Sequence, residues 1–147
     1  MPDTIATLDG YQLSQTPPNP RSPWGRQTEP PYQLRVAGLY TIRTASHGGI
    51  WVAPDLLQEL PQWCREYAKR WSKGNGPQWF EEDCAALLII LAWPDAFAWS
   101  SPEQRAEVLP RIGRDVCSFM DRNESIAPQA TVRAWCRAKI EAAESKR

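Results

Sequence analysis

Two strand-like runs flank a pair of glycines in the first half of the chain. Residues 34–44 are rich in β-branched and aromatic side chains, and residues 50–53 continue that character. Gly48 and Gly49 lie between the runs, where glycine can supply the positive φ of a tight turn. The pattern predicts a β-hairpin, and residues 78–80 are a candidate for a short third strand.

Apolar positions recur at helical spacing after the hairpin. Residues 55–60 read as a short helical turn, and Pro61 begins a helix whose apolar face continues to Trp71. Residues 81–93 begin with three acids in a predicted first helical turn and are then apolar on every side. This last pattern is typical of a central buried helix, and we expect the glycine loop to pack against its N-terminal end.

The second half of the chain is predicted to be helical. Ser101 and Gln104 have the spacing of a capping box, and apolar stripes run through residues 110–120 and 128–143. We therefore predict an α+β fold, with a small antiparallel sheet packed on a layer of about four or five helices. A single domain would span residues 32–147.

Proline sets the first 31 residues apart from that domain. Seven prolines lie between Pro2 and Pro31, and little helical or strand periodicity remains there. We interpret residues 1–31 as an extended, Pro-rich arm, which Tyr11, Trp24 and Tyr32 could hold against the domain. A partner-binding arm is the alternative interpretation.

Charge and apolar run length exclude some classes of partner. The 17 basic and 17 acidic residues balance, so neither a global basic field for nucleic acid nor DNA mimicry is indicated. The longest apolar stretch, residues 84–93, is too short to span a bilayer, and the N-terminus lacks a secretory signal pattern. We expect a cytoplasmic protein in the host cytosol with no membrane partner.

Four cysteines fall on the apolar sides of predicted helices. Positions 64, 84, 117 and 136 form no Cys-x-x-Cys pair, and the chain has one histidine. Reduced thiols packed in the core are therefore expected, with no metal site and no cofactor.

Candidate chemistry gathers at two motifs. His47 lies at the predicted hairpin tip, where it is either a general base or a turn residue that caps the backbone. Cys84 and Asp83 begin the central helix, so a Cys–His nucleophile with an orienting acid is one hypothesis, and a packed thiol beside helix-stabilising acids is the other. The candidate binding surface is made of the tip, the acids and two nearby tryptophans, namely Ser46, His47, Gly48, Gly49, Trp51, Trp79, Glu81 and Glu82.

A basic helix face is a further candidate. Arg65, Lys69, Arg70 and Lys73 lie on the polar side of the helix that begins at Pro61. Such a face can follow a nucleic-acid backbone, but a solvated helix surface explains the same charges.

Two motifs carry a resemblance to proteins of mobile elements. Residues 44–54, with Ser-His-Gly-Gly, and residues 79–84, with Glu-Glu-Asp-Cys, resemble an uncharacterised domain family of phage and plasmid proteins. Gly48-Gly49, residues 50–54, Gly74-Asn75-Gly76 and residues 81–91 are more loosely similar to the KlcA/ArdB antirestriction proteins. The resemblance implies a counter-defence inhibitor of antirestriction or anti-CRISPR type that binds a host defence protein or complex. A hydrolase or transferase using His47 and Cys84, and a small nucleic-acid-binding protein, are the alternatives.

Overall fold

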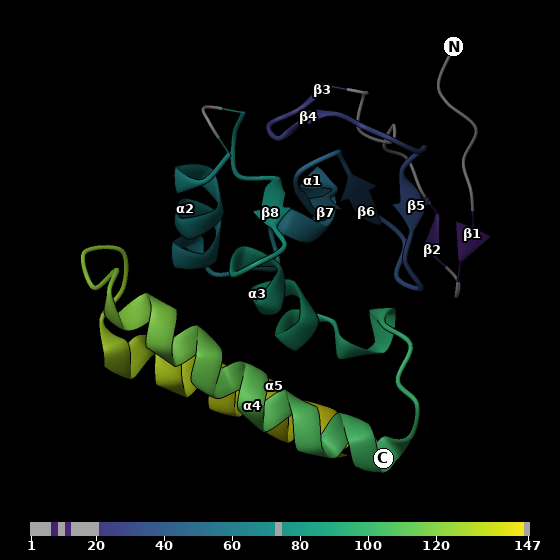
Figure 1. Cartoon of the computed structure of the whole chain (residues 1–147). Helices are drawn as coiled ribbons and strands as arrows, with labels where there is room; N and C mark the ends of the chain where they lie inside the picture. Colours follow the sequence, from purple (N-terminus) through teal and green to yellow (C-terminus); the bar gives the residue numbers. More distant parts are fainter. Residues whose placement is uncertain (1–6, 9–10, 13–20, 73–74, 146–147) are drawn as a thin grey trace. The chain divides into compact units, whose positions relative to one another are not determined.

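The fold is known from a computed structural model that describes residues 7–8, 11–12, 21–72 and 75–145. The chain divides into two compact units, residues 1–86 and 87–147, which are described separately below. Figure 1 labels their helices and strands. The predicted α+β class is confirmed, because an antiparallel sheet and five α-helices are present among the described residues.

A four-stranded antiparallel sheet forms the centre of the first unit (Figure 1). Its strands follow one another in the order β5 (Tyr32–Gln33), β6 (Leu39–Arg43), β7 (Gly48–Val52) and β8 (Trp79–Glu81). The predicted hairpin is β6–β7, in which Leu39 faces Val52 across the pair. Strand β8 confirms the candidate third strand and places Glu81 opposite Gly49.

The glycine pair lies inside strand β7, whereas we had predicted it in the turn. The turn is made by residues 44–47, and neither glycine has positive φ. Close approach explains the glycines: a β-carbon at Gly48 would lie 2.9 Å from the carbonyl oxygen of Ile42. A β-carbon at Gly49 would overlap the carbonyl oxygen of Phe80 and lie 2.6 Å from the indole of Trp24. These residues therefore allow neighbouring groups to pack directly on the strand backbone.

Two short helices connect β7 to β8. Helix α1 (Pro54–Leu57) is followed by α2 (Gln62–Arg70), with Pro61 as its N-cap residue. The predicted apolar face of α2 is buried, and α2 packs near β8. Trp71 differs from the prediction: it follows the helix as its C-cap residue and is 50% exposed, because the chain leaves helical geometry there.

An aromatic cluster fills the core of this unit. It contains Trp24, Ala37, Tyr40, Ile42, Trp51, Ala53 and Trp79. Trp24 and Trp79 meet edge to face at a centroid distance of 5.8 Å, a favourable arrangement for two aromatic rings.

Trp24 enters this cluster from a small hairpin upstream of the sheet. Strands β3 (Arg21–Ser22) and β4 (Gly25–Arg26) form that hairpin, and β1 (Thr7–Leu8) pairs with β2 (Tyr11–Gln12). The N–H of Thr28 donates to the carbonyl oxygen of Arg43 at 2.9 Å. Part of the predicted arm thus contacts the sheet, while residues 1–6, 9–10 and 13–20 lie outside the described range.

The segment between β8 and the central helix also differs from the prediction. We had placed the acids in the first turn of that helix, but Glu81 ends β8 and α3 spans Ala85–Ala92. The N–H of Glu82 donates to the carbonyl oxygen of Gly48 at 3.0 Å, so hydrogen bonding to strand β7 continues past Glu81. Helix α3 therefore begins later in the chain than predicted. Residues 82–84 form a turn that connects the sheet to α3.

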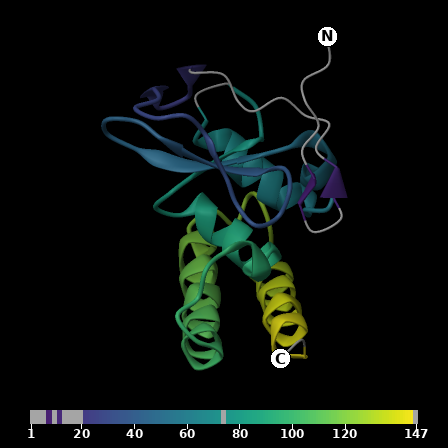
Figure 2. The ribbon, with the colours of Figure 1, turned by 90° about the vertical axis from the view of Figure 1, so that its right-hand side faces the viewer.

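Two long helices dominate the second unit. After the short 3-10 helix η1 (Pro94–Ala96), α4 (Pro102–Asp121) and α5 (Gln129–Ser145) form an antiparallel pair (Figure 2). The N-cap half of the predicted capping box is confirmed, because the Ser101 hydroxyl accepts the N–H of Gln104 at 3.0 Å, whereas the Gln104 side chain accepts the N–H of Ser100 at 2.9 Å. Among the described helices, none is long and apolar enough to cross a membrane.

None of the four cysteines, all of which lie in the described part of the chain, forms a disulfide. Cys64 and Cys136 are buried as expected, whereas Cys84 and Cys117 are partly exposed. Cys84 departs from the prediction in a second way, because it belongs to the turn before α3 and not to a helix face.

Candidate functional site

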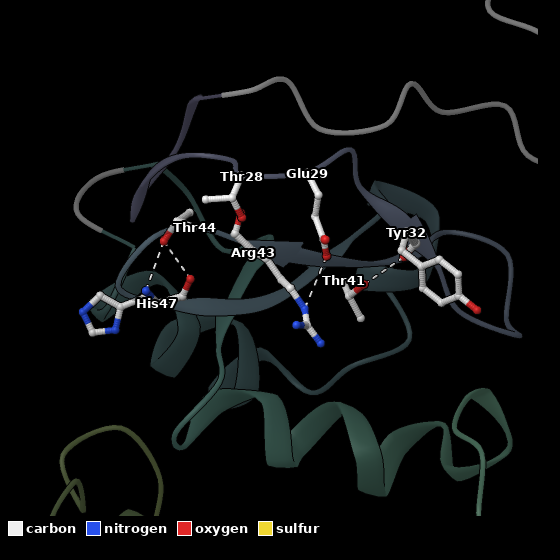
Figure 3. Close-up of polar contacts among 7 residues, drawn as sticks. All are labelled: Thr28, Glu29, Tyr32, Thr41, Arg43, Thr44 and His47. Atoms are coloured by element: carbon white, nitrogen blue, oxygen red, sulfur yellow. Dashed lines mark hydrogen bonds and ion pairs between the residues drawn. The ribbon is translucent and has the colours of Figure 1, made fainter.

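The tip of the β6–β7 hairpin is held in one conformation by Thr44. Its N–H and its hydroxyl donate to the carbonyl oxygen of His47 at 2.8 and 2.7 Å, and the hydroxyl accepts the N–H of His47 at 3.1 Å. Figure 3 shows the two bonds of the Thr44 hydroxyl on the backbone side of His47, with the imidazole pointing away from Thr44. The ring is exposed, and its backbone attachment is fixed.

Two acids from the β8–α3 connection meet this imidazole. One ligand-type atom each from His47, Glu81 and Asp83 lies within 4.8 Å of the other two. The strand register accounts for the meeting, since Gly49 pairs with Glu81 two residues beyond His47. The structure thus confirms the expectation that the hairpin tip lies beside the segment that begins the central helix.

The carboxylate of Glu81 is oriented by its neighbour. The N–H of Asp83 donates to Oε1 of Glu81 at 2.8 Å. Burial raises the pKa of Glu81 above its ordinary value, and the side chain of Asp83 raises it further. The described ion pairs join Arg43 to Glu29 and Arg105 to Asp95, so neither site carboxylate is paired with a lysine or arginine in the described part of the chain.

An apolar-walled pocket of about 370 Å³ adjoins the three polar side chains. It is lined by Trp24, His47, Tyr67, Trp71, Glu81, Asp83 and Cys84. The rings of Tyr67 and Trp71 lie 6.4 Å apart. Burial and the neighbouring Cys84 thiol, which hydrogen-bonds to the phenol, raise the pKa of Tyr67. The pocket therefore combines an aromatic wall with a polar rim that carries two carboxylates.

Trp24, which lines this pocket, has an unsatisfied hydrogen-bond donor. The residue is only 8% exposed, and its indole N–H has no hydrogen-bond partner among the described residues. A buried N–H that lacks an acceptor costs free energy, and such a group in a native protein calls for an explanation.

A second cavity of about 610 Å³ lies on the other side of the hairpin tip. His47, Ser46 and Glu82 line it together with Thr28 and Glu29 from the upstream segment. The carboxylate of Glu82 lies beside Gly48, where an added β-carbon would be 3.0 Å from its Oε2. Glu82 is therefore directed toward this second cavity, and Glu81 and Asp83 toward the first.

The other residues predicted for the binding surface separate into two groups. Ser46 is exposed at the tip, and Gly48 and Gly49 support it from β7. Trp51 and Trp79 are each 8% exposed, and their side chains pack in the core cluster of the sheet.

Only some of the residues predicted for the basic face of α2 are exposed among the described residues. Lys69 and Arg70 are exposed, whereas Arg65 is partly buried, with an Nε atom that has no described partner. Lys73 lies outside the described residues.

Three aromatic residues of the pocket were missed by the sequence-based interpretation. Tyr67 and Trp71 were assigned to a buried helix face, and Trp24 to the arm. A usable signal existed for Trp71, because Gly74-Asn75-Gly76 follows closely and a helix that ends there exposes its last turn.

The chain belongs to the family described as a domain of unknown function, DUF7007, which matches residues 17–145. That match begins within the predicted arm and extends almost to the end of α5. Comparison with curated proteins and with solved structures found no match.

Proposed function

We propose that this protein is a phage or plasmid accessory protein that inhibits a host defence system by binding one of its proteins. The contact surface is the tip surface, which we define as Ser46, His47, Trp71 and the pocket between Trp71 and Trp24. The resemblance of the Ser-His-Gly-Gly and Glu-Glu-Asp-Cys motifs to mobile-element proteins supplies the biological class. The cytosol of the host is the corresponding location.

The exposed ring of Trp71 is the observation that carries the binding mode. Tyr32 and Trp71 are the exposed large hydrophobic residues of the described chain, and Trp71 lines the pocket of about 370 Å³. Tryptophan beside a concave apolar site is the residue type that most often dominates the free energy of protein binding. A partner side chain inserted between Trp71 and Trp24 would gain aromatic contact on both sides.

The locked hairpin tip supports the same proposal. Thr44 fixes the backbone of His47 on both its N–H and its carbonyl side. A surface that is already ordered loses little conformational entropy when it binds, so more of the contact free energy appears as affinity.

A plating assay tests the proposal. Cells that carry individual restriction or CRISPR-type systems are challenged with phage or plasmid while the protein is expressed. We expect at least one system to be relieved, and the Trp71→Ala variant to lose that relief. Tyr32→Ala is the matched control, because it removes an even more exposed aromatic residue that does not line this pocket.

Two results would contradict the proposal. Relief of no system across a broad panel argues against counter-defence, and equal relief by Trp71→Ala and the wild type argues against the tip surface. Melting temperatures of both variants show whether a loss reflects binding or unfolding.

One observation favours a second candidate function, a hydrolase or transferase. His47, Asp83 and Cys84 line the same pocket, so the residues of the hypothetical Cys–His site are brought together. A thiol-directed electrophile should then label Cys84 in the wild type and label it much more slowly in His47→Ala. Equal labelling rates would show that the imidazole does not activate the thiol.

A further inference from the structure

We propose that His47, Glu81 and Asp83 bind a divalent first-row transition-metal ion, of which zinc is the natural probe. This proposal goes beyond the sequence-based expectation, which found the ligand set incomplete and predicted no metal. It also goes beyond protein binding at the tip surface, because it concerns an ion held by this chain alone.

Ligand spacing is the first support. The three donor atoms lie within 4.8 Å of one another, so an ion between them is about 2.8 Å or less from each. Zinc bonds to imidazole nitrogen and carboxylate oxygen are about 2.0–2.2 Å long. Each donor therefore needs to move by less than about 1 Å, and the exposed side chains of His47 and Asp83 are free to rotate that far.

Charge is the second support. Two carboxylates that approach each other with no lysine or arginine paired to them among the described ion pairs repel, and a partly buried position such as that of Glu81 strengthens the repulsion. A divalent cation removes this unfavourable interaction. The neutral imidazole adds a nitrogen donor and no further charge.

Two of the three ligand residues are also supported by hydrogen bonds. Thr44 fixes the backbone of His47, and the N–H of Asp83 orients the Glu81 carboxylate. Ligands positioned by hydrogen bonds before the ion arrives lose less entropy on binding it, as in established metal sites with ordered outer shells.

The donor set selects the class of metal. One imidazole with two carboxylates suits zinc and manganese, whereas calcium and magnesium prefer sites built from oxygen alone. Cys84 lines the pocket but does not belong to the group of converging donors. We therefore expect nitrogen and oxygen ligation without sulfur.

Three protein ligands leave a coordination position for a small molecule. In zinc sites such an open position holds water or a substrate atom. The pocket of about 370 Å³ is lined by all three ligand residues and offers room for such a molecule.

Calorimetric titration of the whole chain with Zn²⁺ tests the proposal. We expect one ion per chain, and at least about tenfold weaker binding in each of His47→Ala, Glu81→Gln and Asp83→Asn. Glu82→Gln is the matched control, because it removes a neighbouring carboxylate that faces the other cavity, and its affinity should stay within about threefold of the wild type. Ca²⁺ and Mg²⁺ should bind far more weakly than Zn²⁺.

A spectroscopic readout keeps the test independent of folding defects. Zn²⁺ should shift the NMR signals of the single imidazole, and Co²⁺ should give a visible spectrum without a thiolate charge-transfer band. An unshifted imidazole, a thiolate band, or equal affinity in all three ligand variants overturns the proposal. Failure of this test leaves partner binding through Trp71 unaffected, since Trp71→Ala removes no metal ligand.

Discussion

Replacing Gly49 by alanine should destabilise the first unit by an amount that the structure allows us to estimate. The added β-carbon overlaps the carbonyl oxygen of Phe80 and lies 2.6 and 3.0 Å from two carbon atoms of Trp24. Comfortable contacts between carbon atoms lie at about 3.5–4.0 Å. Neither neighbouring group can move away easily, because Phe80 is part of the paired strand β8 and the ring of Trp24 packs against that of Trp79.

The size of the effect follows from two opposing contributions. Overpacking of this kind costs about 1–3 kcal/mol, and a clash with paired backbone belongs at the upper end. Alanine reduces the entropy of the unfolded chain and returns about 0.4–1 kcal/mol. We expect a net loss of about 2–3 kcal/mol, which lowers the melting temperature by about 5–10 °C for a chain of this size.

Thermal unfolding measured by circular dichroism gives the change, and hydrogen exchange at the Glu82 amide locates it. The N–H of Glu82 donates a hydrogen bond to the carbonyl oxygen of Gly48, the residue before the substituted position. Gly113→Ala is the control, because its β-carbon meets mainly the flexible end of Ile140 at 2.9 Å and alanine favours the helix. An unchanged or higher melting temperature for Gly49→Ala would refute the close-approach explanation of the glycine pair.

Three further predictions concern single side chains. Ser101→Ala removes the cap on the N–H of Gln104 and should lower the free energy of unfolding by about 1 kcal/mol in chemical denaturation. Burial raises the pKa of Cys136 to about 12, so about one Cys136 thiol in ten thousand is ionised at pH 8. Because the thiolate is the reactive form, mass spectrometry should find Cys136 unalkylated after the native protein is treated with an alkylating reagent. The thiol of Cys136 ionises near pH 9 in the unfolded chain, so the raised pKa of the folded state contributes to the free energy of unfolding below that pH. This contribution should disappear as the pH rises from 9.0 to about 12. Arg43→Ala breaks a 3.4 Å ion pair to Glu29 whose side chains are 75% and 57% exposed, and denaturation should show a change below about 0.5 kcal/mol.

The elements with strong patterns were predictable from the sequence. Alternating β-branched and aromatic residues indicate β6 and β7, and apolar residues on every side indicate α3. The N-cap bond at Ser101 also formed as expected, because it joins residues only three positions apart, while the side chain of Gln104 accepts the N–H of Ser100.

Features that depend on long-range contacts were not predictable. The glycine pair is typical of a turn, but its role here depends on Phe80 and Trp24, which are distant in sequence. The acids at residues 81–83 are typical of a helix start, yet pairing with β7 keeps Glu81 in a strand. Sequence therefore indicated which segments meet at the candidate site, and the sheet register determined which side chains face one another.

The convergence of His47 with Glu81 and Asp83 is the claim on which the metal-site proposal depends. The chain has one histidine, so its ring protons give a single, unambiguous pair of NMR signals. Nuclear Overhauser spectra of protein labelled at histidine and the acids measure the contact directly, without metal or partner. We predict cross-peaks from the His47 ring to the side-chain protons of Glu81 and Asp83, whose donor atoms lie within 4.8 Å of the imidazole donor. Cross-peaks from that ring only to the hairpin turn, with none to either acid, would contradict the account.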